Sequence, residues 1–248
     1  MSGELLNQRP LRRVIRPRVQ STTARLAQSS GSIIELGAAF EKPCHSRRML
    51  TFGTHLRPLS PSMTTTSPDQ SAGLPQSLHA AAAALRLLII DVDGVLTDGA
   101  LYYDTTGEAL KRFHVHDGQG LKLLQQHVIA IAAISGRNSA MVERRLRELG
   151  VDEILQGNEQ KLTVAEAMMR RRGLAWSACA AIGDDLPDLP LLRRAALSVA
   201  PANANAEIKR HVHWTTQASG GNGAVRELAD ALLEARGQRA AAIAPYLQ

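Results

Sequence analysis

From residue 85 onward, the chain alternates between short apolar runs and longer segments in which apolar residues recur about once per helical turn. Short runs such as LLII at 87–90 are typical of buried strands, whereas the periodic segments are typical of amphipathic helices. Strands that alternate with helices build βαβ units around a parallel sheet. The pattern therefore predicts a doubly wound, Rossmann-like α/β fold with three layers.

The same pattern gives the expected elements. We expect strands at residues 87–90, 129–134, 153–156, 178–182, 198–200 and 213–215. We expect helices at residues 118–126, 138–149, 159–172, 186–194 and 224–234, and a helix or a linker at 79–85. Asp117 is the predicted N-cap of the first of these helices after the hairpin region, and Gly150 is the predicted C′ residue that ends the next.

Residues 100–115, ALYYDTTGEALKRFHV, depart from this alternation. The turn sequence DTTG separates two extended pieces, which predicts a β-hairpin, and Asp98 is expected to lie in a turn or at the start of the hairpin. This segment and the connection at 151–160 are both too short to hold a large cap domain. Without a cap, a site at this end of the sheet stays open. We therefore expect a neighbouring subunit to enclose a small substrate, which implies a homo-oligomer.

Composition divides the chain into unequal parts. Apolar residues make up 44% of the chain and aromatic residues 3%, so the core must consist mainly of Ala, Leu, Ile and Val. Residues 1–62 carry ten Lys or Arg against three Glu, whereas the remainder carries 19 basic and 20 acidic residues. We expect a basic and then Ser/Thr/Pro-rich, disordered extension at 1–82, a folded domain at 83–236 and a tail at 237–248.

Charge, cysteines and hydropathy exclude several classes of partner. Because residues 1–62 carry a net charge of +7 and the remainder −1, the near-neutral remainder gives no electrostatic footprint for nucleic acid. Cys44 and Cys179 are far apart and form no CxxC motif, so we expect neither a disulfide framework nor a thiolate zinc site, and a reducing, cytoplasmic compartment. No apolar run is long enough to span a bilayer, so we expect no membrane partner.

Polar residues follow the predicted strands in a repeating way. Asp91 and Asp93 follow the first strand and Ser135 the second, Lys161 lies near the start of the helix after the third, and Asp184 follows the fourth. Parallel strands end at one edge of the sheet, where such folds bind ligands, so we expect these side chains to converge. Crowded carboxylates repel one another unless a cation neutralises them, and an all-oxygen set suits Mg²⁺.

This set of residues also predicts a reaction. A carboxylate can attack a phosphoryl group as a nucleophile, while Lys161 and the Ser135 hydroxyl hold the transferring oxygens. A second carboxylate, that of Asp93, can protonate the leaving alkoxide and later deprotonate the attacking water. The sequence therefore predicts Mg²⁺-dependent phosphoryl transfer through an aspartyl-phosphate.

The motifs that carry this chemistry resemble those of the haloacid dehalogenase superfamily of phosphohydrolases. The likeness rests on IIDVDGVLTD, on ISGR, on the lysine of QGNEQK and on IGDDLPD. The resemblance implies that Asp91 is the nucleophile and a metal ligand, and that Asp93 is the general acid/base and binds the metal through its backbone carbonyl. It also implies that Asp184 is the remaining metal ligand, and that Ser135 and Lys161 bind phosphate.

Four further segments narrow the resemblance, namely GEALKRFHVHDGQGLKLL, ISGRNSAMVERRLRELG, GDDLPDLPLLRRAALSVAPANA and GGNGAVRELAD. They are similar to the capless phosphatases of 3-deoxy-D-manno-octulosonate 8-phosphate, a sugar-acid phosphate of bacterial lipopolysaccharide biosynthesis. The likeness covers about residues 85–236 and implies a homotetramer in which hairpins cover neighbouring sites. The implied substrate-binding residues are Asp93, His114, Val115, His116, Asp117, Gly118, Lys122, Arg137, Arg145 and Lys161.

The chain departs from that pattern at four positions. His114 stands where asparagine is expected, His116 and Lys122 stand where arginine is expected, and Asn222 interrupts a Gly-Gly-Arg-Gly sequence. Replacing Arg by His or Lys loses bidentate recognition of a carboxylate. His116 also introduces a group that titrates near neutral pH.

Several alternatives stay open at this point. A phosphatase of another small metabolite, a non-catalytic regulatory module of the same fold and a phosphoaspartate receiver share parts of the pattern, although the intact carboxylates disfavour the module and Asp93 disfavours the receiver. The pairs His114/His116 and His211/His213 match one half of a zinc site. The run at 220–223, GGNG, is a turn before a helix or a phosphate-binding loop.

Overall fold

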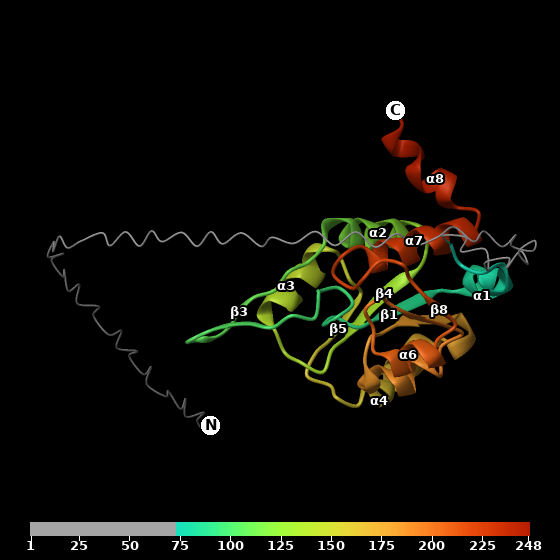
Figure 1. Ribbon diagram of the computed structural model, residues 1–248. Coiled ribbons are helices and arrows are strands. Elements are labelled where there is room, and N and C mark those ends of the chain that lie inside the picture. Colours follow the sequence, from blue (N-terminus) through green and yellow to red (C-terminus); the bar gives the residue numbers. More distant parts are fainter. Residues whose placement is uncertain (1–72) are drawn as a thin grey trace, which may run out of the picture. The chain divides into compact units, whose positions relative to one another are not determined.

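The computed structural model describes residues 73–248, so most of the predicted extension lies outside the described residues. Its centre is a parallel sheet of six strands (Figure 1). From edge to edge the strands are β5 (Glu153–Leu155), β4 (Ala130–Ile134), β1 (Leu87–Ile90), β6 (Cys179–Ile182), β7 (Leu197–Ala200) and β8 (Trp214–Thr215). The chain starts in the middle of the sheet and builds outward in both directions, which confirms the predicted doubly wound fold.

Helices cover both faces of this sheet. They are α1 (His79–Ala84), α2 (Val115–Gln126), α3 (Ala140–Glu148), α4 (Lys161–Arg172), α5 (Leu189–Leu192), α6 (Ala206–His211), α7 (Ala224–Ala235) and α8 (Arg239–Ile243). In Figure 1, α2 and α7 lie above the sheet and α4 and α6 lie below it. The described part of the chain contains no helix that is both long and apolar enough to cross a membrane.

The central strand β1 shows why the sheet needs both layers. Successive side chains of a strand point to opposite faces. Leu88 and Ile90 therefore join the core under α2, α3 and α7, whereas Leu87 and Ile89 join the core formed with α4, α5 and α6. All four side chains are fully buried, as expected of a parallel strand that is covered on both faces.

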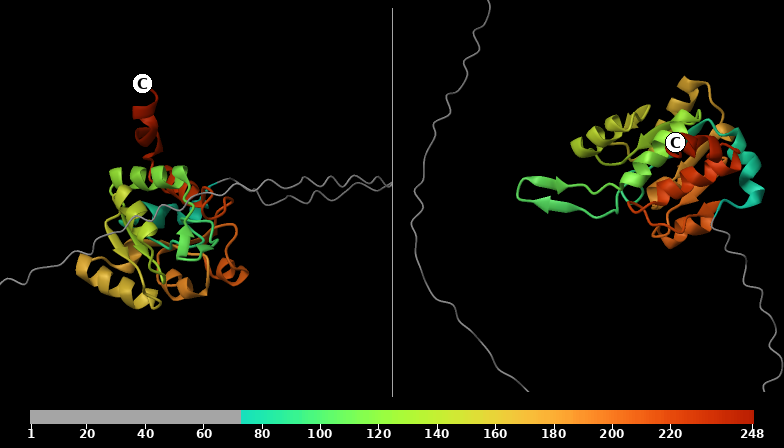
Figure 2. Two further views of the ribbon diagram at one scale, coloured as in Figure 1. Left: turned by 90° about the vertical axis from the view of Figure 1, so that its left-hand side faces the viewer. Right: turned by 90° about the horizontal axis from the view of Figure 1, so that it is seen from above.

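The segment at 100–115 forms the predicted hairpin. Strands β2 (Tyr102–Asp104) and β3 (Gly107–Leu110) pair antiparallel, and the Asp104 carboxylate accepts a hydrogen bond from the backbone N–H of Thr106 at 2.7 Å across the turn. Asp98 begins the hairpin as predicted, because its carboxylate accepts from the backbone N–H of Ala100. The hairpin extends away from the sheet (Figure 2). It is the whole insertion between β1 and α2, so no large cap is present there.

One capping prediction is wrong. Helix α2 begins at Val115 with His114 at its N-cap, so Asp117 lies inside the first turn rather than in front of it. The Asp117 side chain is buried, and it accepts hydrogen bonds from the backbone N–H groups of Gly223 (3.2 Å) and Arg226 (2.8 Å). The carboxylate therefore caps the start of α7, a helix that the local sequence pattern could not associate with it.

Two other elements differ from the prediction. The predicted helix at 186–194 is a 3-10 turn, Leu186–Asp188, followed by the single turn α5, and prolines occupy both pieces at positions 187 and 190. Helix α6 was not expected, although Asn205 is its N-cap and accepts from the backbone N–H of Glu207 at 2.9 Å. The Ala-rich stretch that was expected as helix or linker is helix α1, and the tail region contains α8.

Candidate active site

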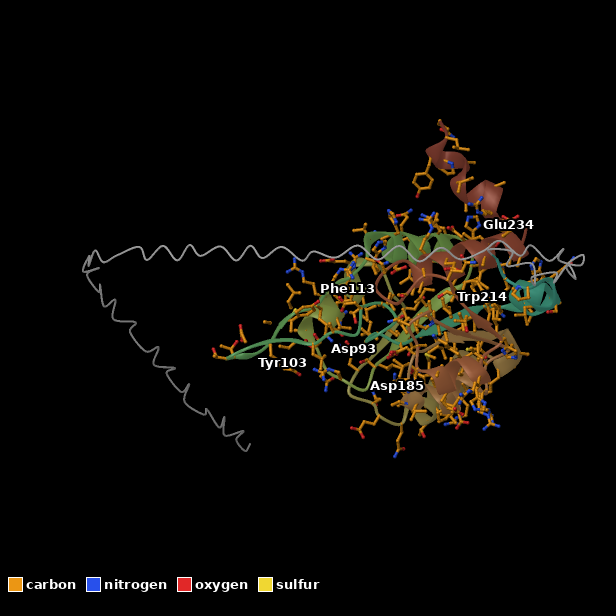
Figure 3. All side chains as sticks on the ribbon, in the orientation of Figure 1. Asp93, Tyr103, Phe113, Asp185, Trp214 and Glu234 are labelled. Atoms are coloured by element: carbon orange, nitrogen blue, oxygen red, sulfur yellow. The ribbon has the colours of Figure 1, made fainter. Side chains whose placement is uncertain are left out.

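A cavity of about 480 Å³ lies at the carboxyl ends of β1, β4 and β6 and at the start of α4. Its walls come from loops that are far apart in the sequence, as the strand-end argument predicts. In Figure 3, Asp93 and Asp185 mark the loops after β1 and β6. The lining residues are Asp91, Asp93, Gly99, Ser135, Gly136, Arg137, Glu159, Lys161, Asp184, Asp185, Pro187 and Asp188.

Lys161, the first residue of α4, lies at the bottom of this cavity between two carboxylates. Its Nζ is 2.7 Å from Asp91 Oδ1 and 2.7 Å from Asp188 Oδ1, and all three side chains are buried. Burial alone would lower the pKa of Lys161, but the charges and hydrogen bonds of the two aspartates outweigh it and raise that pKa. The lysine is therefore held as a cation where the start of α4 meets the loops after β1 and β6.

One lysine does not balance the acidic side chains around it. Asp91, Asp184 and Asp188 each offer a carboxylate oxygen, and these oxygens lie within 4.8 Å of one another. Burial, with the charges of Asp188 and Asp184, raises the pKa of Asp91 well above its usual value despite the neighbouring Lys161. Burial and the charge of Asp188 raise the pKa of Asp184 to about 6. This excess of buried negative charge fits a hard divalent cation with oxygen ligands.

Asp188 is a site residue that the sequence reasoning missed. One of its oxygens pairs with Lys161, and the other accepts from the backbone N–H groups of Asp184 (3.2 Å) and Asp185 (3.3 Å). It thus fixes both the lysine and the loop that carries Asp184. Asp185 and Asp188 form a reciprocal capping box around the 3-10 turn, and the spacing D-x-x-D in DLPD is the signal that could have revealed it.

Two glycines allow the loop after β1 to approach the other loops. Gly94 has a φ of +91°, and a Cβ at this position would lie 2.1 Å from Asp184 Oδ2. A Cβ on Gly220 would lie 1.7 Å from the Gly94 carbonyl oxygen. A side chain at Gly94 would push the loop after β1 away from Asp184, and a side chain at Gly220 would push that loop away from residues 220–223. The run at 220–223 is thus a close-packed turn before α7, as one of the two predicted interpretations has it.

Asp93 faces the hairpin side of the cavity. Its Oδ1 accepts from the ammonium group of Lys111, which directly follows β3, and its Oδ2 lies 3.8 Å from Arg137 Nε. Arg137 also donates to the Tyr103 hydroxyl at 2.9 Å. The buried Ser135 hydroxyl oxygen accepts from the backbone N–H of Arg137 at 3.2 Å. The hairpin region thus contacts two residues that line the cavity, Asp93 through Lys111 and Arg137 through Tyr103.

The structure brings together only part of the predicted set. Asp91, Asp93, Ser135, Arg137, Lys161 and Asp184 line the cavity. The predicted substrate-binding residues at the start of α2, together with Lys122 and Arg145, do not line it. Among these, Val115, His116 and Lys122 are exposed, Asp117 caps α7, and Gly118 packs against Arg145.

The histidine pairs do not form a metal site in the described residues. The rings of His114 and His116 pack edge to face, 4.9 Å apart. His211 pairs with Glu207 on its own helix, and His213 Nδ1 lies 2.8 Å from the Ser198 hydroxyl oxygen. Within residues 73–248, the aspartate group in the cavity is the one set with metal-ligand spacing, so the zinc interpretation has no support there.

Known proteins with similar sequences point to the same chemistry. A family of haloacid dehalogenase-like hydrolases matches residues 152–228. The 3-deoxy-D-manno-octulosonate 8-phosphate phosphatase of Haemophilus influenzae is 42% identical over 154 residues, which cover 62% of this chain and 86% of that protein. The enzyme of the same name from Escherichia coli K12 is 41% identical over 159 residues, covering 64% of this chain and 85% of that protein.

Solved structures agree with this. A probable YrbI family phosphatase from Pseudomonas syringae is 44% identical with a TM-score of 0.69, and the match covers 70% of this chain and 99% of that one. The Moraxella catarrhalis 3-deoxy-D-manno-octulosonate 8-phosphate phosphatase, in complex with magnesium ion, phosphate ion and KDO, is 40% identical with a TM-score of 0.67, covering 69% and 98%. The chain therefore belongs to the 3-deoxy-D-manno-octulosonate 8-phosphate phosphatase family of haloacid dehalogenase-like hydrolases.

Proposed function

We propose that this protein hydrolyses 3-deoxy-D-manno-octulosonate 8-phosphate to the free sugar acid and inorganic phosphate, a step of lipopolysaccharide biosynthesis, and that Mg²⁺ is its metal. The observation that carries the proposal is the buried Asp91, Lys161 and Asp188 group, with its 2.7 Å contacts, at the bottom of an acidic cavity. Relatives of this name, one of them solved with magnesium, phosphate and KDO, match most of the described residues.

The first step assigns Asp91 as the nucleophile. One carboxylate oxygen of Asp91 attacks the phosphorus atom, and the bond from phosphorus to the sugar oxygen breaks, so an aspartyl-phosphate forms. Lys161, which contacts Asp91 Oδ1, and the Ser135 hydroxyl hold the phosphoryl oxygens. Positioning and charge neutralisation supply most of the catalysis in phosphoryl transfer.

Asp93 serves in both halves of the reaction. Its carboxylic acid gives a proton to the departing sugar oxygen, which leaves as an alcohol. The resulting carboxylate then takes a proton from a water molecule that attacks the aspartyl-phosphate, and phosphate and free Asp91 are released. Its side chain is 20% exposed and lines the cavity, so a substrate and a water molecule can reach it.

The carboxylate oxygens of Asp91 and Asp184 and the backbone carbonyl of Asp93 are the groups that we propose as protein ligands of Mg²⁺. When bound, the ion supplies charge neutralisation between these carboxylates and the phosphoryl oxygens. The raised pKa values of Asp91 and Asp184 support this set, because both groups lack a sufficient countercharge within the chain. Asp188 is assigned to Lys161 and to the loop backbone instead.

The remaining predicted residues would bind the sugar acid. Arg137 lines the cavity and offers its guanidinium to an anionic group. His114, Val115, His116, Asp117, Gly118, Lys122 and Arg145 stay proposals for substrate binding, and they do not line the cavity of their own chain. His116, Lys122 and Asn222 depart from the family pattern, so the preference for this substrate over another sugar phosphate is the part of the proposal that most needs a test.

We further propose that the protein is a homotetramer in the cytoplasm. The hairpin and the start of α2 expose large apolar side chains, namely Leu101, Tyr102, Tyr103, Leu110 and Val115. A contiguous exposed apolar region is typical of a protein interface. The domain bounds of 83–236, with an extension at 1–82 and a tail at 237–248, also remain a proposal.

The test is phosphate release from a panel of sugar phosphates and aryl phosphates by the full-length chain, with Mg²⁺ and with EDTA. We expect 3-deoxy-D-manno-octulosonate 8-phosphate to have the highest kcat/KM, and EDTA to abolish release from every substrate. If hexose or aryl phosphates serve equally well, the substrate is wrong and the phosphatase assignment stands. Release that is unaffected by EDTA would contradict the metal.

A further inference from the structure

Lys111 is a buried cation that the steps above leave unused. It follows β3 at the base of the hairpin, and only 1% of its side chain is exposed. Its ammonium group donates to Asp93 Oδ1 and lies 3.2 Å from Glu108 Oε1. Lysine is almost never buried to this extent unless it is paired, because removing its charge from water is unfavourable. Lys111 does not line the cavity, so its contacts are with protein carboxylates.

Lys111 and Arg137 contact different oxygens of the Asp93 carboxylate. Lys111 contacts Oδ1, and Arg137 Nε lies 3.8 Å from Oδ2. The Arg137 side chain is 42% exposed, so a substrate can draw it away, whereas the Lys111 side chain is enclosed by protein. The orientation of the Asp93 carboxylate therefore depends mainly on the lysine.

Lys111 is itself fixed by Glu108. The second oxygen of the Glu108 carboxylate accepts from the hydroxyl of Ser139, the N-cap residue of α3, at 2.6 Å. Burial favours a higher pKa of Glu108, but the hydrogen bond from Ser139 and the charges of Lys111 and Arg137 prevail and lower it. Glu108 thus stays an anion that joins the hairpin to α3 and holds Lys111 between two carboxylates.

We propose that Lys111 is a positioning residue that aims the Asp93 carboxyl group at the sugar oxygen in the first step and at the water in the second. The inference rests on the proposed function, because it needs Asp93 as the acid/base. A proton-transfer group must be within hydrogen-bond reach of the atom it serves, and a small misplacement slows the reaction strongly. Losing Lys111 frees the Asp93 side chain and leaves it beside the like charge of Glu108.

The test compares two substrates of the variant Lys111→Met in the full-length chain. A sugar phosphate needs a proton on its leaving oxygen, whereas nitrophenolate leaves without one. We expect kcat for the sugar-acid phosphate to fall about 10²-fold, while the rapid-mixing burst of nitrophenolate, which reports attack by Asp91, stays within about threefold of the wild-type rate. The steady-state rate after the burst falls as well, because breakdown of the aspartyl-phosphate needs Asp93 as a base.

Arg112→Met is the matched control. Arg112 is the next residue of the chain after Lys111, its side chain is 48% exposed, and it pairs with the carboxylate of Asp98 at 3.5 Å. We expect its rates with both substrates to match those of wild type. Lys111→Arg keeps the charge and should recover at least about tenfold of the lost kcat, which a purely structural loss would not allow.

The outcomes separate the two proposals. A wild-type enzyme that does not release phosphate from the sugar-acid phosphate refutes the proposed function and leaves the nitrophenyl phosphate comparison to judge Lys111. Equal losses of the burst and of sugar-phosphate turnover, or a change confined to KM, overturn the positioning role. If Lys111→Met does not fold, as judged by its thermal unfolding, Lys111→Arg and Glu108→Gln are compared on the same two substrates, and a uniform loss in both overturns it.

Discussion

The carboxyl ends of the parallel strands line the cavity, whereas the β2–β3 hairpin contacts a cavity residue from outside through Tyr103, and the two regions differ in almost every physical property. The strand ends carry buried charges, such as Lys161 with its two aspartates, and an excess of carboxylates. The hairpin carries exposed aromatic and aliphatic side chains, such as Tyr103, which is 59% exposed. The contrast teaches that one chain brings the proposed groups for phosphoryl transfer together by itself, whereas the surface that we propose encloses the sugar is exposed to solvent.

The largest expected effect comes from removing the proposed nucleophile at the strand ends. Asp91→Asn should lower kcat at least about 10⁴-fold, because the amide cannot attack phosphorus. Folding should be preserved, since burial and neighbouring charges already disfavour the Asp91 carboxylate. Phosphate release and circular dichroism measure the two effects. A variant with wild-type turnover would exclude Asp91 as the nucleophile.

The hairpin is tested next. Tyr103→Ser combined with Leu110→Ser removes two of its exposed apolar side chains. If the hairpin joins subunits, light scattering should show smaller particles, and kcat/KM for the sugar-acid phosphate should fall about 10-fold to 100-fold as an open site loses substrate contacts. Turnover of nitrophenyl phosphate at saturation should change much less. A wild-type protein that is monomeric while fully active would refute the tetramer.

The metal gives a pH-dependent prediction. The pKa of Asp184 is raised to about 6, so in EDTA its charge destabilises the folded state as pH rises from about 4 to 6, because the unfolded chain ionises first. The Tm in EDTA should therefore fall over this range. Above pH 6, Mg²⁺ at 100-fold its Kd should raise the free energy of unfolding by about 2.7 kcal/mol and so raise the Tm. Asp184→Asn, measured by the same thermal unfolding, should flatten both trends. An Mg²⁺ effect that is equal at pH 5 and pH 7.5 would contradict this account.

The smallest expected effect is on stability and comes from the contact between α2 and the start of α7. Asp117→Ala removes the acceptor for two backbone N–H groups at the start of α7, which should lower the free energy of unfolding by about 1–3 kcal/mol in urea titrations. Asp230→Ala, which breaks a partly exposed ion pair with Arg226 on the same helix, should cost less than about 1 kcal/mol. Equal effects would show that Asp117 does not support α7.

The sequence could predict the sheet because its signals are local. The run LLII is short, apolar and followed by polar residues, and the structure places Asp91, Ser135 and Lys161 together because parallel strands end at one edge. Asp188 and Lys111 were missed because they join the site through side-chain contacts with distant residues. Asp188 pairs with a lysine 27 positions away, and Lys111 pairs with an aspartate 18 positions away. Asp117 was assigned to the wrong helix for the same reason, since its partners are 106 and 109 positions away.

The close approach of the loops at Gly94 and Gly220 also bears on how the enzyme is made. The backbone N–H of Gly221 donates to the Val95 carbonyl at 2.9 Å, and no side chain fits between the loops at Gly220. Domains are synthesised from the amino end. More than a hundred further residues must therefore be made before residues 220–223 can pack against the loop that carries Asp91 and Asp93. A ribosome-bound chain that has not yet released residues 220–223 should therefore be inactive, so catalytic competence arrives late in translation.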